Sequence, residues 1–94
     1  MYTHVFRSGQ NPTRHPTVIL IHGLGGTLTI WDPIASVLEQ RFSVLQYDLR
    51  GHGQSDVPAG DWSLEDFVGD LEAIFINGSL SHAHLVGFSL GGLI

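Results

Sequence analysis

Cysteine is absent from the sequence, and only four of its 94 residues are lysine or arginine. The lack of cysteine excludes disulfides, thiolate metal sites and a cysteine nucleophile, and it is compatible with a reducing compartment. The formal net charge is −5, and four scattered cations provide no electrostatic footprint for nucleic acid or anionic membranes. The longest aliphatic run, Val18 to Ile21, is far shorter than the roughly 20 residues of a membrane helix. No secretory signal follows Met1, so we expect a cytoplasmic protein with neither a nucleic-acid nor a membrane partner.

Apolar residues and glycine are plentiful. Hydrophobic residues make up 43% of the chain and charged residues 14%, a composition typical of a globular protein rather than a disordered one. Glycine contributes 12 residues, near twice its usual share of about 7%, which indicates tight turns or close backbone approaches. The length predicts a single domain over residues 1–94 and argues against a second.

Strand-like and helix-like segments alternate along the chain. Strands are predicted at 17–21, 43–47 and 83–88, with a short strand conceivable within residues 1–7 and a turn-rich loop at 8–16. A helix is predicted to begin at Asp32-Pro33, a second to run from Ser63 to Asn77, and a third to begin at Leu90. This order predicts a three-layer α/β fold with a mostly parallel sheet, in which the loops after all three strands meet at one edge.

The third predicted strand leads into the pattern Gly-x-Ser-x-Gly at residues 87–91. A serine in a sharp turn from strand to helix exposes its hydroxyl, and the positions two residues before and after it must be very small. Gly87 and Gly91 meet that demand around Ser89. The pattern also arises by chance in a glycine-rich chain, so its place between a strand and a helix is what makes it informative. We predict that Ser89 is a nucleophile; a plain glycine-rich turn is the alternative.

The glycine-rich loop at residues 22–26 follows the first core strand. Two backbone N–H groups can stabilise the negative oxygen of a tetrahedral intermediate without reorganising. One is expected from Leu90, after the nucleophile, and the other from Leu24, with Gly25 as second choice. Gly23 and Gly25 give this loop its freedom, and a plain turn after the strand is the alternative.

Three further features have both a structural and a functional interpretation. The segment 48–55 lacks the pattern of a phosphate loop and is expected to brace the sheet edge through an Asp48–Arg50 contact. His82 and His84 are expected to be solvated rather than to bind a metal. Trp31, Trp62 and Phe88 are candidates for a substrate pocket, with core packing as the alternative for the two tryptophans.

Three blocks of this sequence resemble the N-terminal part of the α/β-hydrolase family. They are HGLGGTLTIWDP at 22–33, RFSVLQYDLRGHGQSDVP at 41–58 and HLVGFSLGG at 84–92, and within the family they look most like 3-oxoadipate enol-lactonases. The resemblance covers residues 17–94. It implies a partial α/β-hydrolase fold, truncated after the nucleophile elbow, in which Ser89 attacks a lactone or ester carbonyl. It implies no metal and no organic cofactor. Related epoxide hydrolases and haloalkane dehalogenases carry an aspartate where this chain has Ser89.

The family's triad continues after the serine with an acid and then a histidine, and neither residue type occurs after Ser89. We therefore expect a fragment of a serine hydrolase that is inactive alone. If the three core strands stand in the order second, first, third, the last has an open outer edge through which the chain could self-associate. The alternatives are a non-catalytic binding or interaction fragment, a receptor-like relative, or another activity of the fold such as a general esterase, a perhydrolase or haloperoxidase, or a C–C bond hydrolase.

Overall fold

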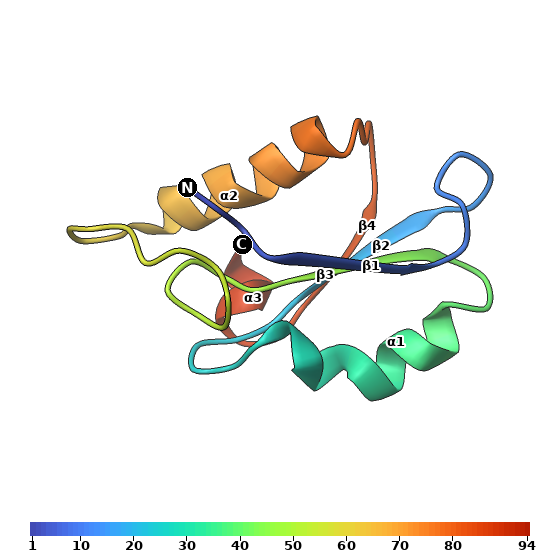
Figure 1. Ribbon diagram of the computed structural model, residues 1–94, viewed down its shortest axis with the longest axis horizontal. Coiled ribbons are helices and arrows are strands. Elements are labelled where there is room, and N and C mark those ends of the chain that lie inside the picture. Colours follow the sequence, from blue (N-terminus) through green and yellow to red (C-terminus); the bar gives the residue numbers. More distant parts are fainter.

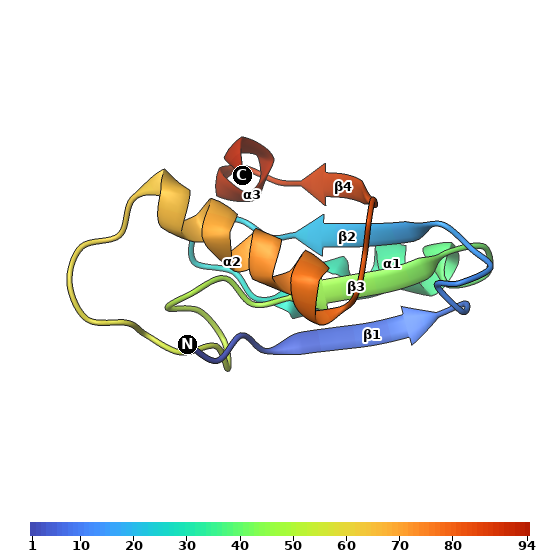
Figure 2. The ribbon, with the colours of Figure 1, turned by 90° about the horizontal axis from the view of Figure 1, so that it is seen from above.

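Three parallel strands form the centre of the fold. In the computed structural model, which describes residues 1–94, they are β2 (Thr17–Ile21), β3 (Ser43–Tyr47) and β4 (His84–Gly87). β2 pairs with β3 on one side and with β4 on the other, as Figure 2 shows. Every residue of β2 and β3 is buried, as expected for strands covered on both faces. The predicted α/β fold and the order of the three core strands are confirmed.

A fourth strand, β1 (Val5–Gly9), closes the side of the sheet next to β3. It runs antiparallel to β3, from Val5 opposite Tyr47 to Gly9 opposite Ser43, and the sheet order is β1-β3-β2-β4. β1 therefore covers the edge of β3 that the three core strands alone would leave open. Gly9 allows this pairing because it has φ +81°, and a Cβ atom there would meet the carbonyl oxygen of Phe42.

Helices cover both faces of the sheet (Figure 1). On one face lie the 3₁₀ turn η1 (Leu28–Trp31) and helix α1 (Asp32–Leu38), and on the other lies α2 (Leu64–Asn77). The short helix α3 (Leu90–Leu93) follows β4, and its Leu90 packs on the α2 side. The Ser63 amide donates a 2.9 Å hydrogen bond to the Asp66 carboxylate at the start of α2, as the predicted cap requires.

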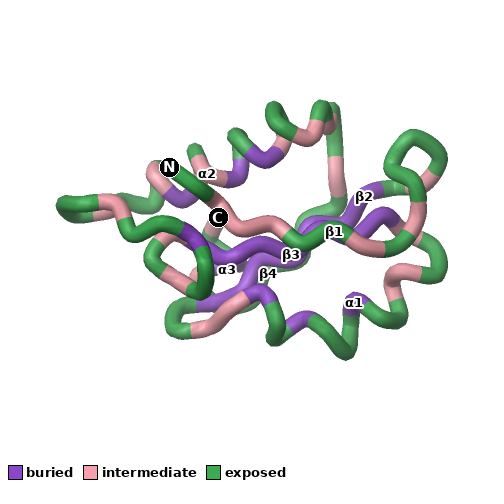
Figure 3. The backbone as a smooth tube through the Cα atoms, viewed as in Figure 1, coloured by how far each residue is buried: buried purple, intermediate pink, exposed green.

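Alternate residues of the central strands pack into two separate hydrophobic cores. Ile19 and Ile21 of β2 point toward α2, where they pack with Leu71. Val18 and Leu20 belong to the second core, on the α1 side. This division follows from the period of two along a strand, and it produces the three layers. Figure 3 shows the buried residues gathered in the central strands and along the inner side of α2.

β4 differs from its neighbours because all four of its residues are exposed. It stands at the end of the sheet, so its outer edge has no partner strand. Leu85 and Val86 keep 48% and 41% of their accessible surface. None of the helices combines the length and the apolar character of a membrane span, and the longest, α2, has 14 residues.

Candidate active site

The chain turns a sharp corner at Ser89, between β4 and α3. Ser89 has φ 57° and ψ −118°, one of only two non-glycine residues with positive φ. Such a conformation costs about 1–3 kcal/mol and persists only where the surroundings impose it. Ser89 is exposed, and its side chain makes no capping hydrogen bond to α3. The strand, corner and helix predicted from the sequence are therefore all present.

The two glycines of the motif lie where no side chain fits. A Cβ atom on Gly87 would meet the carbonyl oxygen of Gly91 and come within 2.7 Å of the Gly92 Cα. A Cβ atom on Gly91 would meet the carbonyl oxygen of Ile21 and lie 2.7 Å from that of His22. The first glycine lets the helix fold back onto the strand, and the second lets the helix approach the end of β2. Both contacts hold the corner at Ser89 in its strained conformation.

The loop after β2 packs directly against this corner. A Cβ atom on Gly23 would lie 3.0 Å from the Ser89 Cβ and 3.0 Å from the Phe88 carbonyl oxygen. The Phe88 amide also donates a 3.1 Å hydrogen bond to the carbonyl of Ile21, so β2 fixes the corner from the other side. Segments that are 66 residues apart in the sequence, at Gly23 and Ser89, thus form one site.

The backbone amides of Leu24 and Leu90, close to the corner, have no hydrogen-bond partner in the protein. Leu90 is the first residue of α3, so its N–H has no acceptor within the helix. In the loop after β2, the Gly25 amide donates to His52 Nε2 at 2.9 Å, and the Gly26 amide donates to the Gly23 carbonyl at 3.1 Å. Leu24 makes no such bond, and its residue is 76% exposed. The sequence suggests Leu24 or Gly25 as the donor from this loop. In the structure the Gly25 amide is bound and the Leu24 amide is free.

His22 is fully buried at the end of β2, and both of its ring nitrogens are occupied. Its Nε2 accepts the Leu49 amide at 3.0 Å, and its Nδ1 lies 2.7 Å from the Gly23 carbonyl oxygen. Burial lowers the pKa of His22 below 6.5, and the nearby His52 lowers it further against the opposing hydrogen bond to Gly23. His22 is therefore a neutral structural group and not a base for Ser89.

The predicted contact between Asp48 and Arg50 is wrong, because each of the two side chains has other partners. Arg50 instead forms a two-pronged ion pair with Asp70 of α2, at 2.7 and 2.8 Å, and its guanidinium lies over the ring of Trp62. The side-chain hydrogen bonds to Asp70 raise the pKa of Arg50. The buried Asp48 carboxylate accepts the amides of Leu28, at 2.8 Å, and Gln54, at 3.0 Å. Asp48 is thus satisfied by backbone, which leaves Arg50 free to reach α2.

The aromatic candidates for a pocket separate into core and surface. Trp31 is buried with Val18 and Ala35 in the core beneath α1, so in this structure its ring serves packing rather than a pocket. Trp62 is partly buried against the α2 core and stacks edge-on with Phe67. Phe88 is 62% exposed beside Ser89 and is the aromatic side chain that the corner presents.

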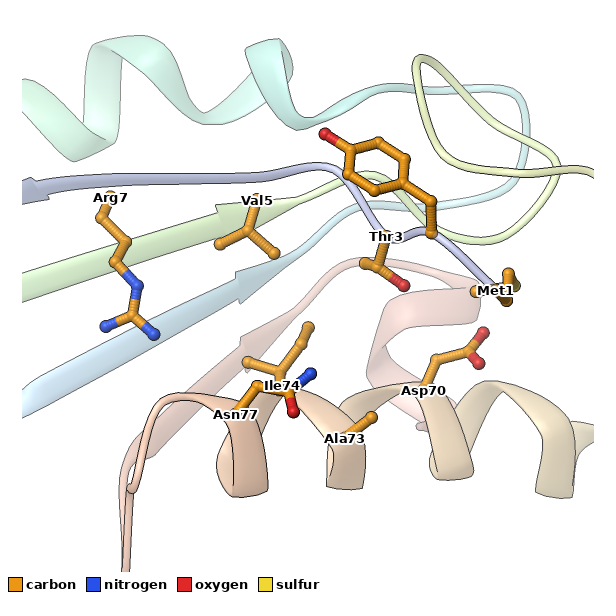
Figure 4. Close-up of a pocket in the computed structure, with 9 residues that line it drawn as sticks. Met1, Thr3, Val5, Arg7, Asp70, Ala73, Ile74 and Asn77 are labelled. Atoms are coloured by element: carbon orange, nitrogen blue, oxygen red, sulfur yellow. The ribbon is translucent and has the colours of Figure 1, made fainter.

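The cavities of the structure lie away from Ser89. A cavity of about 350 Å³ separates β1 from α2, as Figure 4 shows. Arg7 from the strand and Asn77 from the helix line it, together with the N-terminal residues. Neither this cavity nor the other three include Ser89 in their lining. No group of three or more acidic, histidine or cysteine side chains is placed to hold a metal ion, and His82 instead lies 3.0 Å from the Ser81 hydroxyl.

The sequence patterns indicate the corner, its glycines and the loop amides, but they do not indicate His52. This half-buried residue contacts the loop of the site through the Gly25 amide. A histidine in a polar, glycine-rich segment carries no periodic signal, so its contact with a loop 27 residues away was not predictable.

Comparison with known proteins agrees with this geometry. The family model of the alpha/beta hydrolase fold matches residues 16–94. A relative of Mycobacterium tuberculosis without an ascribed function is 39% identical over 77 residues, which are 82% of this chain and 23% of that protein. RutD of Escherichia coli, to which a carbamate hydrolase activity is ascribed, is 39% identical over 80 residues, covering 84% of this chain and 30% of RutD.

Solved structures are similar over nearly the whole chain. The enol-lactonase from Burkholderia xenovorans superposes with a TM-score of 0.93 at 34% identity, covering 97% of this chain and 35% of the enzyme. An esterase from a marine microorganism has a TM-score of 0.87 at 31% identity, over 96% of this chain and 33% of the esterase. This chain therefore spans 23–35% of the length of these proteins, and it corresponds to a partial version of their fold. On its sequence and its structure, the chain belongs to the alpha/beta hydrolase fold family.

Proposed function

We propose that this chain carries the nucleophile and the oxyanion site of a serine hydrolase acting on carboxylic esters or lactones. One observation carries the proposal: Ser89 occupies a strained, exposed corner at φ 57°, against a loop whose Leu24 amide has no partner. Strain of this kind is retained where it serves a function, because an ordinary turn would relax it. The membership of a hydrolase family supports the same conclusion.

In this mechanism the Ser89 oxygen attacks the carbonyl carbon and its proton passes to a base. A new C–O bond forms, and the carbonyl oxygen takes the negative charge of the tetrahedral intermediate. The amides of Leu24 and Leu90 donate to that oxygen, and the positive end of α3 adds a smaller contribution. Collapse of the intermediate breaks the bond to the alkoxide or enolate, which leaves as the alcohol or enol once protonated.

No residue of this chain is placed to act as that base. His22 and His52 both use their two ring nitrogens for backbone contacts, and the residues after Ser89 include neither a histidine nor an acid. We propose that the chain alone has little activity of this type, and that activity requires an imidazole and a carboxylate supplied by other residues.

The substrate class is inferred from the relatives. The enol-lactonase and the esterase are each at least 31% identical to this chain. Enol-lactones and esters share an acyl carbon attached to an oxygen leaving group, which matches a serine with two amides facing the acyl oxygen. We favour a lactone or enol-lactone, since the enol-lactonase gives the higher TM-score of the two. In an enol-lactone the leaving enolate is comparatively stable, so it needs little assistance from a general acid.

A second candidate function is non-catalytic association. The outer edge of β4 is unpaired, and the apolar side chains of Leu85 and Val86 are exposed on this strand. Unpaired apolar edges accept further strands. We propose that a second copy of this chain adds its own β4 to this edge.

A chimera tests the catalytic proposal. Residues 1–94 would replace the matching 35% of the Burkholderia xenovorans enol-lactonase, so that the rest of that enzyme completes the fold. We expect saturable hydrolysis of ester or enol-lactone substrates by the chimera, its loss in Ser89→Ala, and none by the chain alone. Ser81→Ala is the matched control, because Ser81 is an exposed serine that lies 3.0 Å from a histidine nitrogen yet has no strained corner. Ser81→Ala should leave the activity unchanged, and a folded chimera that keeps its activity in Ser89→Ala would overturn the proposal.

A further inference from the structure

Two histidines connect the loop after β2 with the loop after β3, each reaching across to the other. We propose that His22 and His52 form a reciprocal pair of imidazole bridges, and that His52 is a positioning residue that leaves the Leu24 amide free to face the acyl oxygen. The assignment of that amide rests on the proposed function. The bridges themselves rest on hydrogen bonds and are tested separately.

The first bridge starts in the loop after β2. His22 Nε2 lies 3.0 Å from the Leu49 amide, which can only donate, so this nitrogen carries no hydrogen. In the neutral ring the hydrogen must then be on Nδ1, which donates to the Gly23 carbonyl at 2.7 Å. His22 thereby joins its own loop to Leu49, at the start of the loop after β3.

The second bridge runs in the opposite direction. His52 Nε2 accepts the Gly25 amide at 2.9 Å, so its hydrogen is also on Nδ1, which donates to the Arg50 carbonyl at 2.9 Å. His52 belongs to the loop after β3 and reaches the loop after β2. The two rings lie side by side, with centroids 5.3 Å apart. Both rings therefore adopt the same tautomer and perform the same task from opposite sides.

Together the two bridges fix both ends of the Leu24 residue. On its N-terminal side, the Gly23 carbonyl is held by His22 and also accepts the Gly26 amide at 3.1 Å. On its C-terminal side, the Gly25 amide is held by His52, at a residue with φ +81°. Gly25 is exposed, and a Cβ atom added to it would meet no atom within 4 Å, so that side of the residue is open. The hydrogen bond to His52 is therefore the contact that we expect to orient its amide.

His52 also keeps the Gly25 amide from competing with that of Leu24. Loop 22–26 offers three successive N–H groups at residues 24, 25 and 26, and two of them are bound within the protein. Of these three amides, that of Leu24 is then the one that can donate to a ligand. A single fixed donor opposite Leu90 is the arrangement that stabilises an oxyanion without reorganisation.

NMR spectroscopy of the 94-residue chain tests the bridges without reference to activity. Long-range proton–nitrogen spectra of the imidazoles are expected to show the Nδ1–H tautomer for both His22 and His52. In His52→Ala we expect the Gly25 amide to exchange with solvent up to about tenfold faster and its resonance to shift. In His52→Gln the side-chain oxygen replaces Nε2 as acceptor, so protection of Gly25 is expected to return. His82→Gln, a change in an exposed histidine outside both loops, should leave the Gly25 amide unaltered.

Two results would overturn the inference. One is an Nε2–H tautomer at His52 in the unaltered chain, a measurement that no folding defect of a variant can obscure. The other is unchanged exchange of the Gly25 amide in a folded His52→Ala chain. If the bridges are found but Ser89→Ala leaves hydrolysis by the chimera intact, the proposed function fails and the bridges stand. If the bridges are absent while Ser89 is essential, only the inference about His52 fails.

Discussion

The two sides of the candidate site are built very differently. On the side of β2 and β3, every strand residue is buried, and the loops that follow are held by His22, Asp48 and Arg50. On the side of β4, every strand residue is exposed and one edge of the strand is unpaired. The proposed nucleophile, Ser89, lies on this second side.

The difference shows where the geometry of the site comes from. The corner at Ser89 has little packing of its own, so its conformation depends on contacts with the rigid side. Those contacts are the close approach of Gly91 to the end of β2, that of Gly23 to Ser89, and the hydrogen bond from Phe88 to Ile21. The conformation of the exposed side is therefore determined by its contacts with the buried side.

Gly91→Ala should have the largest effect on stability, because it separates the corner from the end of β2. Its Cβ would meet backbone atoms of Ile21 and His22, which cannot move without disturbing β2. We expect a loss of about 3 kcal/mol in the free energy of unfolding, measured by urea denaturation.

Gly69→Ala is the matched control, an exposed glycine within α2 that has no atom near its Cβ position. It should stabilise the chain by about 0.5–1 kcal/mol. Equal effects of the two alanines would show that the corner does not depend on its contact with β2.

Asp70→Asn tests the buried side directly. It removes the charge that pairs with Arg50, whose side chain is only 13% exposed, and so frees the loop after β3 from α2. We expect a loss of about 2 kcal/mol in the free energy of unfolding. Asp61→Asn, at an exposed residue of the preceding loop, should change it by less than about 0.5 kcal/mol. A loss as small as that in Asp61→Asn would show that the ion pair between Arg50 and Asp70 does not stabilise this side of the site.

The sequence predicted the elements of the fold better than the arrangement of its strands. The β-branched and apolar residues at 17–21 and 43–47 predicted both strands to the residue, and Ser63 with Asn77-Gly78 predicted the limits of α2. The pairing of β1 with β3 and the exposure of β4 depend on which strands are neighbours, which local periodicity does not report.

Within the site, local patterns were informative and long-range contacts were not. The Gly-x-Ser-x-Gly pattern predicted the corner because its steric demand is local. Local spacing pairs Arg50 with Asp48, only two residues away, whereas its partner in the structure, Asp70, is 20 residues away. The contact of His52 with Gly25 is long-range in the same way.

Acid should weaken the buried side through His22. Its pKa in the folded chain is lowered by burial, so the unfolded chain binds the proton more readily. This contribution to stability is fully present above the ordinary pKa of 6.5 and is lost as the pH falls below it toward the folded value. We expect the free energy of unfolding to fall by up to about 1.4 kcal/mol per pH unit over that range. Urea denaturation between pH 7.5 and 5 measures this slope, and His22→Gln should make it shallower; an equal slope in that variant would exclude His22 as the cause.

Val86→Lys should have the smallest effect on stability and should still change association. Val86 is exposed on the open edge strand, where a lysine opposes the addition of a further strand. We expect sedimentation velocity to show fewer dimers, with a change of less than about 0.5 kcal/mol in the free energy of unfolding. Val37→Lys places the same charge on α1, at a residue 68% exposed, and should leave association unaltered. Dimers that persist in Val86→Lys would locate the interface elsewhere.

The central claim is that Ser89 and the amides of Leu24 and Leu90 form one oxyanion-binding corner. The most direct test is to react the chimera with a fluorophosphonate and to follow the amide resonances of the adduct by NMR. We predict a single label on Ser89, with downfield shifts of both the Leu24 and the Leu90 amide protons as they donate to the phosphoryl oxygen. A label on another residue, or an adduct at Ser89 that leaves both amide protons unmoved, would contradict the claim.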